Sequence, residues 1–137
     1  MRALVLALAV PLAAPCLMGC TLLKGSPAAT PEWKAVTSRE YSMPTTAVFP
    51  AVRSMCTDRL LSIKRDDAGQ GLLVTEWHRS DILLSGTTVY EFRTTPTQAG
   101  TLVSLLIYRK VGYRTRRLVR EAGEYDDLFL ALDKKLD

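Results

Sequence analysis

Apolar residues near the end of the chain recur with the period of an α-helix. They occupy every third or fourth position, at Tyr125, Leu128, Phe129, Leu132 and Leu136. A stripe of this kind forms the apolar face of a helix that packs on a core. Acidic residues come at the start of the segment and Lys134 and Lys135 lie near its end, as the helix dipole favours. The pattern predicts a helix that begins at Gly123.

A second helical pattern lies between residues 45 and 60. Its apolar positions are Phe49, Val52, Cys56 and Leu60. Thr45 or Thr46 is the expected N-cap, because a threonine hydroxyl accepts a hydrogen bond from a free backbone N–H of the first turn. Pro50 falls in or just after that turn, where its missing N–H does least damage. We therefore predict a helix over this segment.

Five segments have the alternating or β-branched character of strands. They are residues 36–43, 61–65, 72–78, 87–95 and 101–110. Asp and Gly in residues 66–71 and Pro and Gly in residues 96–100 predict turns. Residues 79–86 are predicted to form a loop, whose apolar tip Ile82–Leu84 either folds onto the core or makes an exposed contact.

The order of these elements is β-α-β-β-β-β-α. Strands that are joined by short turns pair antiparallel, and both helices must bury their apolar stripes on one face of the sheet. We therefore predict an α+β fold: a two-layer sandwich with an antiparallel sheet of about four to five strands and two helices on one face. The globular domain is expected to cover residues 36–137.

The first residues have a different pattern, that of a secretory signal peptide. Arg2 precedes the apolar run from Ala3 to Leu17, and the small residue Gly19 precedes Cys20. Residues 17–20 (Leu-Met-Gly-Cys) resemble a lipobox, the motif of bacterial lipoprotein precursors. The resemblance implies that residues 1–19 are removed and that Cys20 becomes a lipidated N-terminus, carrying diacylglycerol and an acyl chain such as palmitate.

Two other interpretations of this segment remain open. Cleavage after Gly19 also suits an ordinary secreted protein. An uncleaved membrane anchor is less well supported, because a spanning helix needs about 20 apolar residues and this run is shorter and contains Pro11 and Pro15. Thr21 is not the Asp that resembles an inner-membrane retention signal, so in a bacterium with two membranes we expect a lipoprotein of the outer membrane that faces the periplasm.

Residues 20–35 are predicted to be a flexible linker, because Gly, Ser, Pro, Ala and Thr occur there without apolar periodicity. Fifteen extended residues reach at most about 50 Å. Removal of 19 of the 137 residues leaves 118, enough for one small domain. The net charge of the whole chain is only +4. With Cys16 removed and Cys20 lipidated, Cys56 has no partner for an intramolecular disulfide.

Six positive side chains and no acidic one lie between residues 109 and 120. They are Arg109, Lys110, Arg114, Arg116, Arg117 and Arg120. They are candidate contacts for an anionic surface, such as lipid headgroups, or for an acidic protein. The simpler interpretation is a solvated loop whose arginines pair with Glu121, Glu124, Asp126 and Asp127. We expect no nucleic acid as a partner of a secreted lipoprotein.

The sequence offers little catalytic chemistry. His78 is the single histidine, and its pairing with Cys56 as a nucleophile would need the two to be adjacent in the fold. Asp66 and Asp67 are better explained as turn residues than as a carboxylate pair or a calcium site. One histidine and one free cysteine cannot form a closed zinc site. We therefore expect no catalytic residues, no cofactor and no metal.

Residues 46–77 resemble the repeating unit of BamC-like lipoproteins. The resemblance is carried by the helix at 48–60, the strand around Ile63, the turn from Asp67 to Gly71 and the strand at 72–77. It implies a helix-grip domain, with two helices against an antiparallel sheet, in a family whose namesake is an accessory lipoprotein of the outer-membrane β-barrel assembly machine. The family brings no catalytic residues.

These observations predict a non-enzymatic, lipid-anchored envelope protein that binds other envelope proteins or helps to assemble a complex. The alternative is a module that binds a lipid or a peptidoglycan fragment between the helices and the sheet. An enzyme is the third interpretation. An apolar pocket of several hundred Å³ between helices and sheet would favour the ligand module, and a filled core with an exposed apolar patch would favour a protein partner. The oligomeric state does not follow from the sequence.

Overall fold

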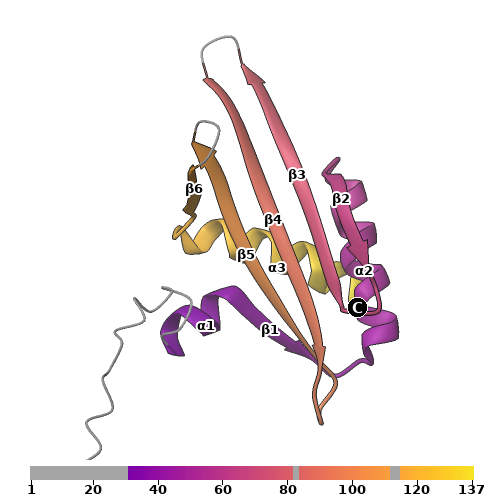
Figure 1. Ribbon diagram of the computed structural model, residues 1–137. Helices are drawn as coiled ribbons and strands as arrows, with labels where there is room; N and C mark the ends of the chain where they lie inside the picture. Colours follow the sequence, from indigo (N-terminus) through magenta and orange to yellow (C-terminus); the bar gives the residue numbers. More distant parts are fainter. Residues whose placement is uncertain (1–30, 82–83, 112–114) are drawn as a thin grey trace, which may run out of the picture.

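A computed structural model describes residues 31–81, 84–111 and 115–137 of the chain. These residues form three helices and six strands. In chain order the elements are α1 (Pro31–Thr37), β1 (Ser38–Tyr41), α2 (Thr45–Asp58), β2 (Ser62–Asp67), β3 (Leu72–Asp81), β4 (Leu84–Pro96), β5 (Thr101–Val111), β6 (Thr115–Leu118) and α3 (Ala122–Leu136). Figure 1 shows their arrangement.

All strand pairs are antiparallel, and the strands lie in the order β1-β5-β4-β3-β2. β6 also pairs with β5, beyond the part of β5 that β1 covers. β3, β4 and β5 are long central strands, and the hairpin of β3 and β4 extends past its neighbours (Figure 1). The predicted α+β class with an antiparallel sheet is confirmed, with one strand more than expected.

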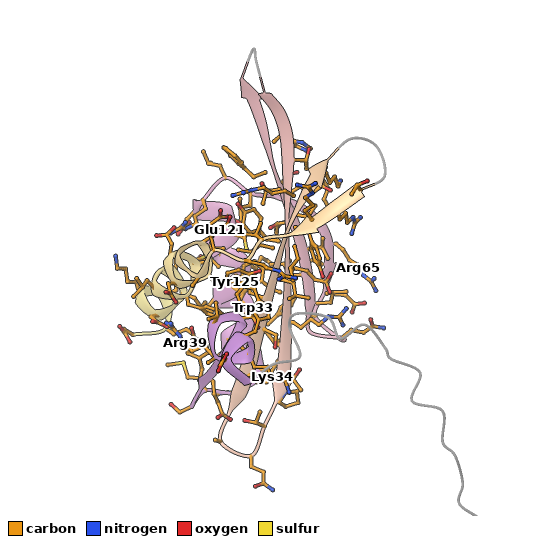
Figure 2. The ribbon with its side chains drawn as sticks, turned by 90° about the vertical axis from the view of Figure 1, so that its left-hand side faces the viewer. Trp33, Lys34, Arg39, Arg65, Glu121 and Tyr125 are labelled. Carbon is orange, nitrogen blue, oxygen red and sulfur yellow. The ribbon has the colours of Figure 1, made fainter. Side chains whose placement is uncertain are left out.

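α2 and α3 cover one face of the sheet and form the core with it, as Figure 2 shows from the side. The core side chains of the helices include Val52, Phe49, Tyr125 and Phe129, and those of the sheet include Leu73, Phe92, Val103, Leu105 and Ile107. The opposite face carries Arg65, on the far side from the helices (Figure 2). The two-layer arrangement predicted from the helical stripes is therefore confirmed.

The predicted linker ends earlier than expected, because residues 31–37 form α1. Trp33 of α1 packs edge-to-face against Tyr125 of α3, with 5.5 Å between the ring centroids (Figure 2). The hydroxyl of Thr37 donates to the carbonyl of Trp33 at 3.0 Å. Val36, three residues after Trp33, also packs against the core, so two apolar side chains of α1 hold it on the domain. Ten residues then separate Cys20 from Pro31, and their extended reach is at most about 35 Å.

Two segments that were predicted as loops are strands. Residues 79–81 and 84–86 continue the hairpin, since Arg79 pairs with Gly86 and Asp81 with Leu84. The tip residues Ile82 and Leu83 lie outside the described residues. Residues 115–118 form β6, which pairs with the end of β5. Both corrections have one cause: an antiparallel ladder continues wherever a neighbouring backbone offers free N–H and C=O groups, even without an apolar pattern.

The predicted threonine cap of α2 is not formed. The N-cap residue is Pro44, and no side chain caps the helix. The carbonyl of Pro44 accepts from the N–H groups of Ala47 and Val48 instead. The hydroxyl of Thr45 lies 3.3 Å from that of Thr101, which donates to the carbonyl of Met43. The side chain of Thr45 therefore ties the start of the helix to β5.

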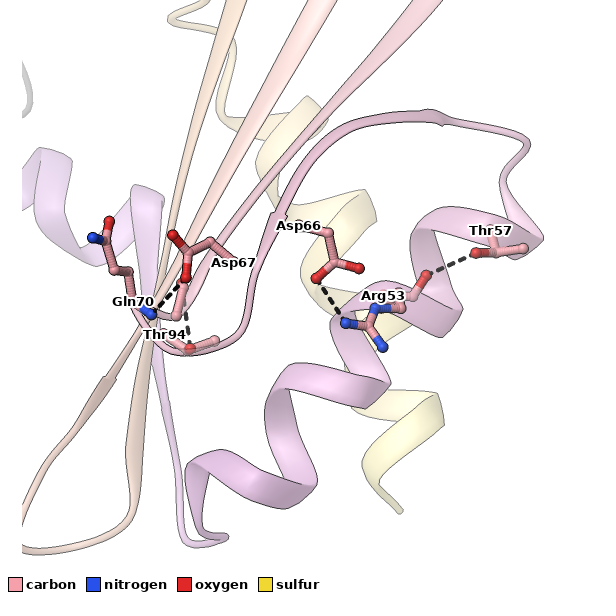
Figure 3. A network of polar contacts seen from close by, with 7 residues as sticks. Arg53, Thr57, Asp66, Asp67, Gln70 and Thr94 are labelled. Carbon is pink, nitrogen blue, oxygen red and sulfur yellow. Dashed lines mark hydrogen bonds and ion pairs between the residues drawn. The ribbon is translucent and has the colours of Figure 1, made fainter.

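The predicted turn after β2 is confirmed, and it explains both aspartates (Figure 3). Asp67 accepts a 3.0 Å hydrogen bond from the backbone N–H of Gln70. Asp66 accepts a 2.7 Å hydrogen bond from Arg53, which ties β2 to α2. Gly71 ends the turn at φ +63°, where a Cβ would come within 2.3 Å of the carbonyl oxygen of Thr94. The aspartates therefore act as structural residues, as the sequence indicated.

Candidate functional site

A cleft of about 340 Å³ opens where the helices end over the sheet. It is formed by the residues that follow α2, by the first half of α3 and by the central strands β3 and β4. Its lining residues are Arg59, Leu61, Trp77, Tyr90, Glu124, Asp127 and Leu128. We call it the Trp77 cleft.

The cleft exists because the strands are longer than the helices that cover them. α2 has 14 residues, which span about 21 Å at 1.5 Å per residue. β3 has only 10 residues but spans about 33 Å. Leu73, Thr75 and Trp77 alternate onto the helix-covered face of β3, and the first two are fully buried. Trp77 lies beyond the part of β3 that the helices cover, and its side chain is 42% exposed.

The floor of the cleft is apolar. Leu61 and Tyr90 are partly buried against the core, and Leu128 of α3 is almost wholly buried. Burial raises the pKa of the Tyr90 hydroxyl, and the nearby Glu124 carboxylate adds to the effect. Tyr90 therefore remains neutral at physiological pH. The floor offers a bound group one hydroxyl among aromatic and aliphatic surfaces.

The charged side chains around the cleft are already paired with one another. Arg59 donates to the Asp127 carboxylate at 2.7 Å and to its backbone carbonyl at 3.3 Å. The hydrogen bond from Arg59 lowers the pKa of Asp127. Glu124 forms an ion pair with Arg109 of β5. Because these charges are compensated, the cleft suits a neutral apolar group better than an ion.

An exposed leucine stands beside the cleft, between two of its lining residues. Leu60 follows α2, is 87% exposed and has φ +58°. The N–H of Leu60 donates to the Thr57 carbonyl and that of Leu61 to the Cys56 carbonyl, both at 3.0 Å. This is a Schellman motif with leucine at the position where glycine is favoured. Its backbone is therefore in a conformation that is unfavourable for a residue with a Cβ, and its side chain is exposed to solvent.

Neither Leu60 nor Trp77 was predicted as a site residue from the sequence. The helical pattern includes Leu60 among its apolar positions, and Trp77 belongs to the predicted strand at residues 72–78. The alternation of Leu73, Thr75 and Trp77 is present in the sequence, but it does not show that the helices stop short of Trp77. The predicted strand at residues 72–78 spans about 23 Å and the predicted helix between residues 45 and 60 about 24 Å, so the predicted lengths did not reveal an uncovered end of the sheet.

The predicted basic segment is divided by the fold. Arg109 and Lys110 lie near the end of β5, Arg116 and Arg117 lie in β6, and Arg120 precedes α3; Arg114 lies outside the described residues. Two of the basic side chains are paired: Arg109 with Glu124, and Lys110 with Glu76 at 2.6 Å. Within the described ranges Arg116, Arg117 and Arg120 form no ion pair. Of the predicted ion pairs with downstream acidic residues, the described residues show only that of Arg109 with Glu124.

Cys56 and His78 are not brought together. Cys56 is fully buried on the core side of α2, and burial raises the pKa of its thiol to about 12. His78 lies on the other face of the sheet, where its Nδ1 is 3.0 Å from the Thr87 hydroxyl and its Nε2 is 3.5 Å from Glu76. The thiol is therefore protonated near neutral pH, and His78 lies on the other face of the sheet and not beside it. The arrangement is not that of a nucleophile pair.

Cys20, the predicted lipid attachment site, lies outside the described residues. Among the residues that are described, no group of three or more His, Cys, Asp or Glu side chains is placed to hold a metal ion. In the same part of the chain, no helix has the length and apolar character needed to cross a membrane.

Comparison with models of known protein families and with curated proteins gave no match for this chain.

Proposed function

We propose that this chain is a lipid-anchored protein of the bacterial envelope that binds a protein partner in the Trp77 cleft and catalyses no reaction. Cys20 carries the lipid, the outer membrane is its location, and the domain faces the periplasm. In this role it is an accessory or assembly module of an envelope complex, as its likeness to BamC-like lipoproteins implies.

The observation that carries the proposal is Trp77, which lines the cleft and is 42% exposed, together with the exposed Leu60, whose chain neighbours Arg59 and Leu61 line the same cleft. Tryptophan is among the residues that contribute most to binding at protein interfaces. Leu60 has a backbone conformation that costs about 1 kcal/mol for a residue with a Cβ. Strain that persists at a surface position is typical of sites kept for function. A partner that covers these two side chains removes their apolar surface from water, which favours binding.

The expected occupant is a segment of a partner protein that presents a large apolar side chain. The rim charges are compensated by the Arg59–Asp127 and Arg109–Glu124 pairs, so no net charge on the partner is required. The lipid anchor would hold the cleft within a short distance of the membrane surface, since at most about 35 Å of chain separates Cys20 from α1. A partner in or near the same membrane is therefore within reach.

The volume of the cleft supports a second candidate function. About 340 Å³ is at the lower end of the range of small-molecule sites. The cleft also lies between helices and sheet, where a ligand module was expected to hold its ligand. A lipid chain or a peptidoglycan fragment is the alternative occupant.

Photocrosslinking in cells tests the proposal. A photoreactive phenylalanine analogue is placed at position 77, and in a matched control at position 78, which is adjacent and exposed but on the opposite face. We expect capture of a protein from position 77 and not from position 78. The captured protein is then purified, and Trp77→Ala is expected to weaken its binding at least about tenfold, with His78→Ala unchanged.

Equal capture at both positions, or no effect of Trp77→Ala, would contradict the protein-partner proposal. Capture of lipid or glycan alone at position 77 would support the alternative. The anchor is tested separately by growth with labelled palmitate. We expect label on the wild-type chain and none on Cys20→Ala, and an unlabelled wild-type product would overturn the lipoprotein assignment.

A further inference from the structure

A second cavity, of about 380 Å³, lies where β5, β6 and the start of α3 meet. Its lining residues are Arg109, Arg117, Leu118, Val119, Arg120 and Glu121. We call it the arginine pocket. The Arg109–Glu124 ion pair lies between the two cavities, because Arg109 lines this one and Glu124 lines the Trp77 cleft.

The strand register separates the basic side chains into two groups. Arg109 and Arg117 are directly opposite each other in the ladder and share the face that α3 covers. Lys110 and Arg116 are likewise paired in the ladder but lie on the other face. There Lys110 is held by Glu76. The pocket therefore gathers Arg109 and Arg117 with Arg120 and leaves Arg116 outside.

The charge in the arginine pocket is not fully compensated. Glu124 pairs with Arg109, but Arg117 and Arg120 form no ion pair within the described part of the chain. The remaining acidic group is Glu121, whose carboxylate accepts a 3.1 Å hydrogen bond from the backbone N–H of Arg120. Three guanidinium groups face two carboxylates, which leaves a surplus of one positive charge. The Glu121 carboxylate repels a bound anion, whereas the guanidinium groups of Arg117 and Arg120 attract it.

We infer that the arginine pocket binds a phosphate group. The planar guanidinium donates two parallel hydrogen bonds to phosphate oxygens, and both Arg117 in β6 and Arg120 two residues after that strand line this cavity. The inference does not rest on the Trp77 cleft and stands whether or not that cleft binds a protein.

A phosphate in this pocket has two chemical sources, a phospholipid headgroup or a soluble phosphate ester. The full chain in a non-ionic detergent is titrated with each source at constant ionic strength. The probes are inorganic phosphate and dihexanoyl phosphatidylglycerol below its micelle concentration. Binding is followed by the NMR signals of the arginine Nε–H groups, which report each guanidinium separately.

The matched variants are Arg117→Gln and Arg120→Gln inside the pocket and Arg116→Gln outside it. Each removes one positive charge from the same short segment. We expect Arg117→Gln and Arg120→Gln to weaken binding at least about fivefold and Arg116→Gln to change it less than about twofold. Tighter binding of the lipid analogue would assign the headgroup as the source, and tighter binding of inorganic phosphate would assign a soluble ester.

Two results would overturn the inference. One is no binding of either probe up to about 10 mM. The other is an equal loss of binding in all three variants, which would show a diffuse basic surface rather than a pocket. The substituted arginines are exposed, so the variants are expected to unfold at the wild-type temperature, and a circular dichroism melt verifies this for each one.

Discussion

The hydroxyl of Tyr125 donates a 2.8 Å hydrogen bond to the backbone carbonyl of Val119, six residues earlier in the chain. The same hydroxyl accepts from the N–H of Ile107 in β5 at 3.4 Å. Val119 in turn donates its own N–H to the carbonyl of Ile107 at 2.8 Å. One fully buried tyrosine thus fixes the connection between β6 and α3 against β5, and with it the position of both cavities.

Replacement of Tyr125 by Phe is expected to lower the free energy of unfolding by about 1–3 kcal/mol, because the Val119 carbonyl is left without the tyrosine hydroxyl in a buried place. Urea denaturation followed by circular dichroism measures this change. Tyr108→Phe is the matched control, since Tyr108 lies on the open face of β5 and its hydroxyl bonds to no described residue. A loss below about 0.5 kcal/mol in Tyr125→Phe would contradict the structural role of this hydroxyl.

Leu60→Gly is expected to stabilise the domain by about 0.5–1 kcal/mol. Glycine adopts the left-handed conformation of the Schellman motif without the clash that a Cβ causes. The leucine side chain is exposed, so its removal costs little burial. Thermal or urea unfolding measures the gain.

The same variant is expected to weaken binding of the protein captured at Trp77. Higher stability together with weaker partner binding would be the mark of a residue kept for contact rather than for folding. A destabilised Leu60→Gly variant would show that the leucine packs on the domain itself.

Glu76 should make stability depend on pH. A hydrogen bond from Lys110 holds the pKa of Glu76 below its ordinary value of 4.5, and Lys64 and His78 add positive charge nearby. A carboxyl with a lowered pKa in the folded state stabilises the fold above its unfolded pKa. That stabilisation is lost as the pH falls through the folded pKa.

We therefore expect Glu76→Gln to be less stable than the wild type at pH 7, and the difference to shrink steadily below about pH 4.5. Urea denaturation at several pH values measures it. In a Lys110→Met background the Glu76→Gln substitution is expected to cost less at pH 7. A difference that stays constant from pH 7 to pH 3 would show that the ion pair does not contribute.

Cys56 is expected to be inert. Its thiol is fully buried, and its pKa of about 12 keeps it protonated near neutral pH. A thiol reagent should therefore modify the native protein only as fast as the domain opens, and modify it quickly in denaturant. Rapid labelling of the native chain would contradict this placement.

Cys56→Ala is expected to cost about 1–2 kcal/mol of stability through lost packing, and to leave partner binding unchanged. The same urea and binding measurements apply. A loss of binding without a loss of stability would reopen the question of chemistry at this sulfur.

The elements that the sequence predicted correctly are those whose own residues carry a periodic pattern. The stripe of Tyr125, Leu128, Phe129 and Leu132 forms the buried face of α3, and β4 and β5 cover the segments that alternate. Periodicity is sufficient there because a buried face needs apolar residues at fixed spacing. The turn at Asp67 was predictable for a local reason too, since its hydrogen bond spans only three residues.

The elements that the sequence missed depend on distant partners. α1 has seven residues, too few for a stable isolated helix, and it is held by the contact of Trp33 with Tyr125. β6 has four residues and no apolar alternation, and it forms because the end of β5 offers it a ladder. The hairpin beyond His78 is longer than predicted for the same reason.

By itself, the order of residues determined the class of fold, the face of each main element that is buried, and the lipobox-like motif that ends at Cys20, since these depend on local spacing and composition. Only the tertiary structure decided that Trp77 is uncovered and that Arg109, Arg117 and Arg120 share a cavity while Arg116 is excluded. The reason is geometric: a cleft is the space left between elements, and its shape depends on their relative lengths and register rather than on the pattern within any one of them.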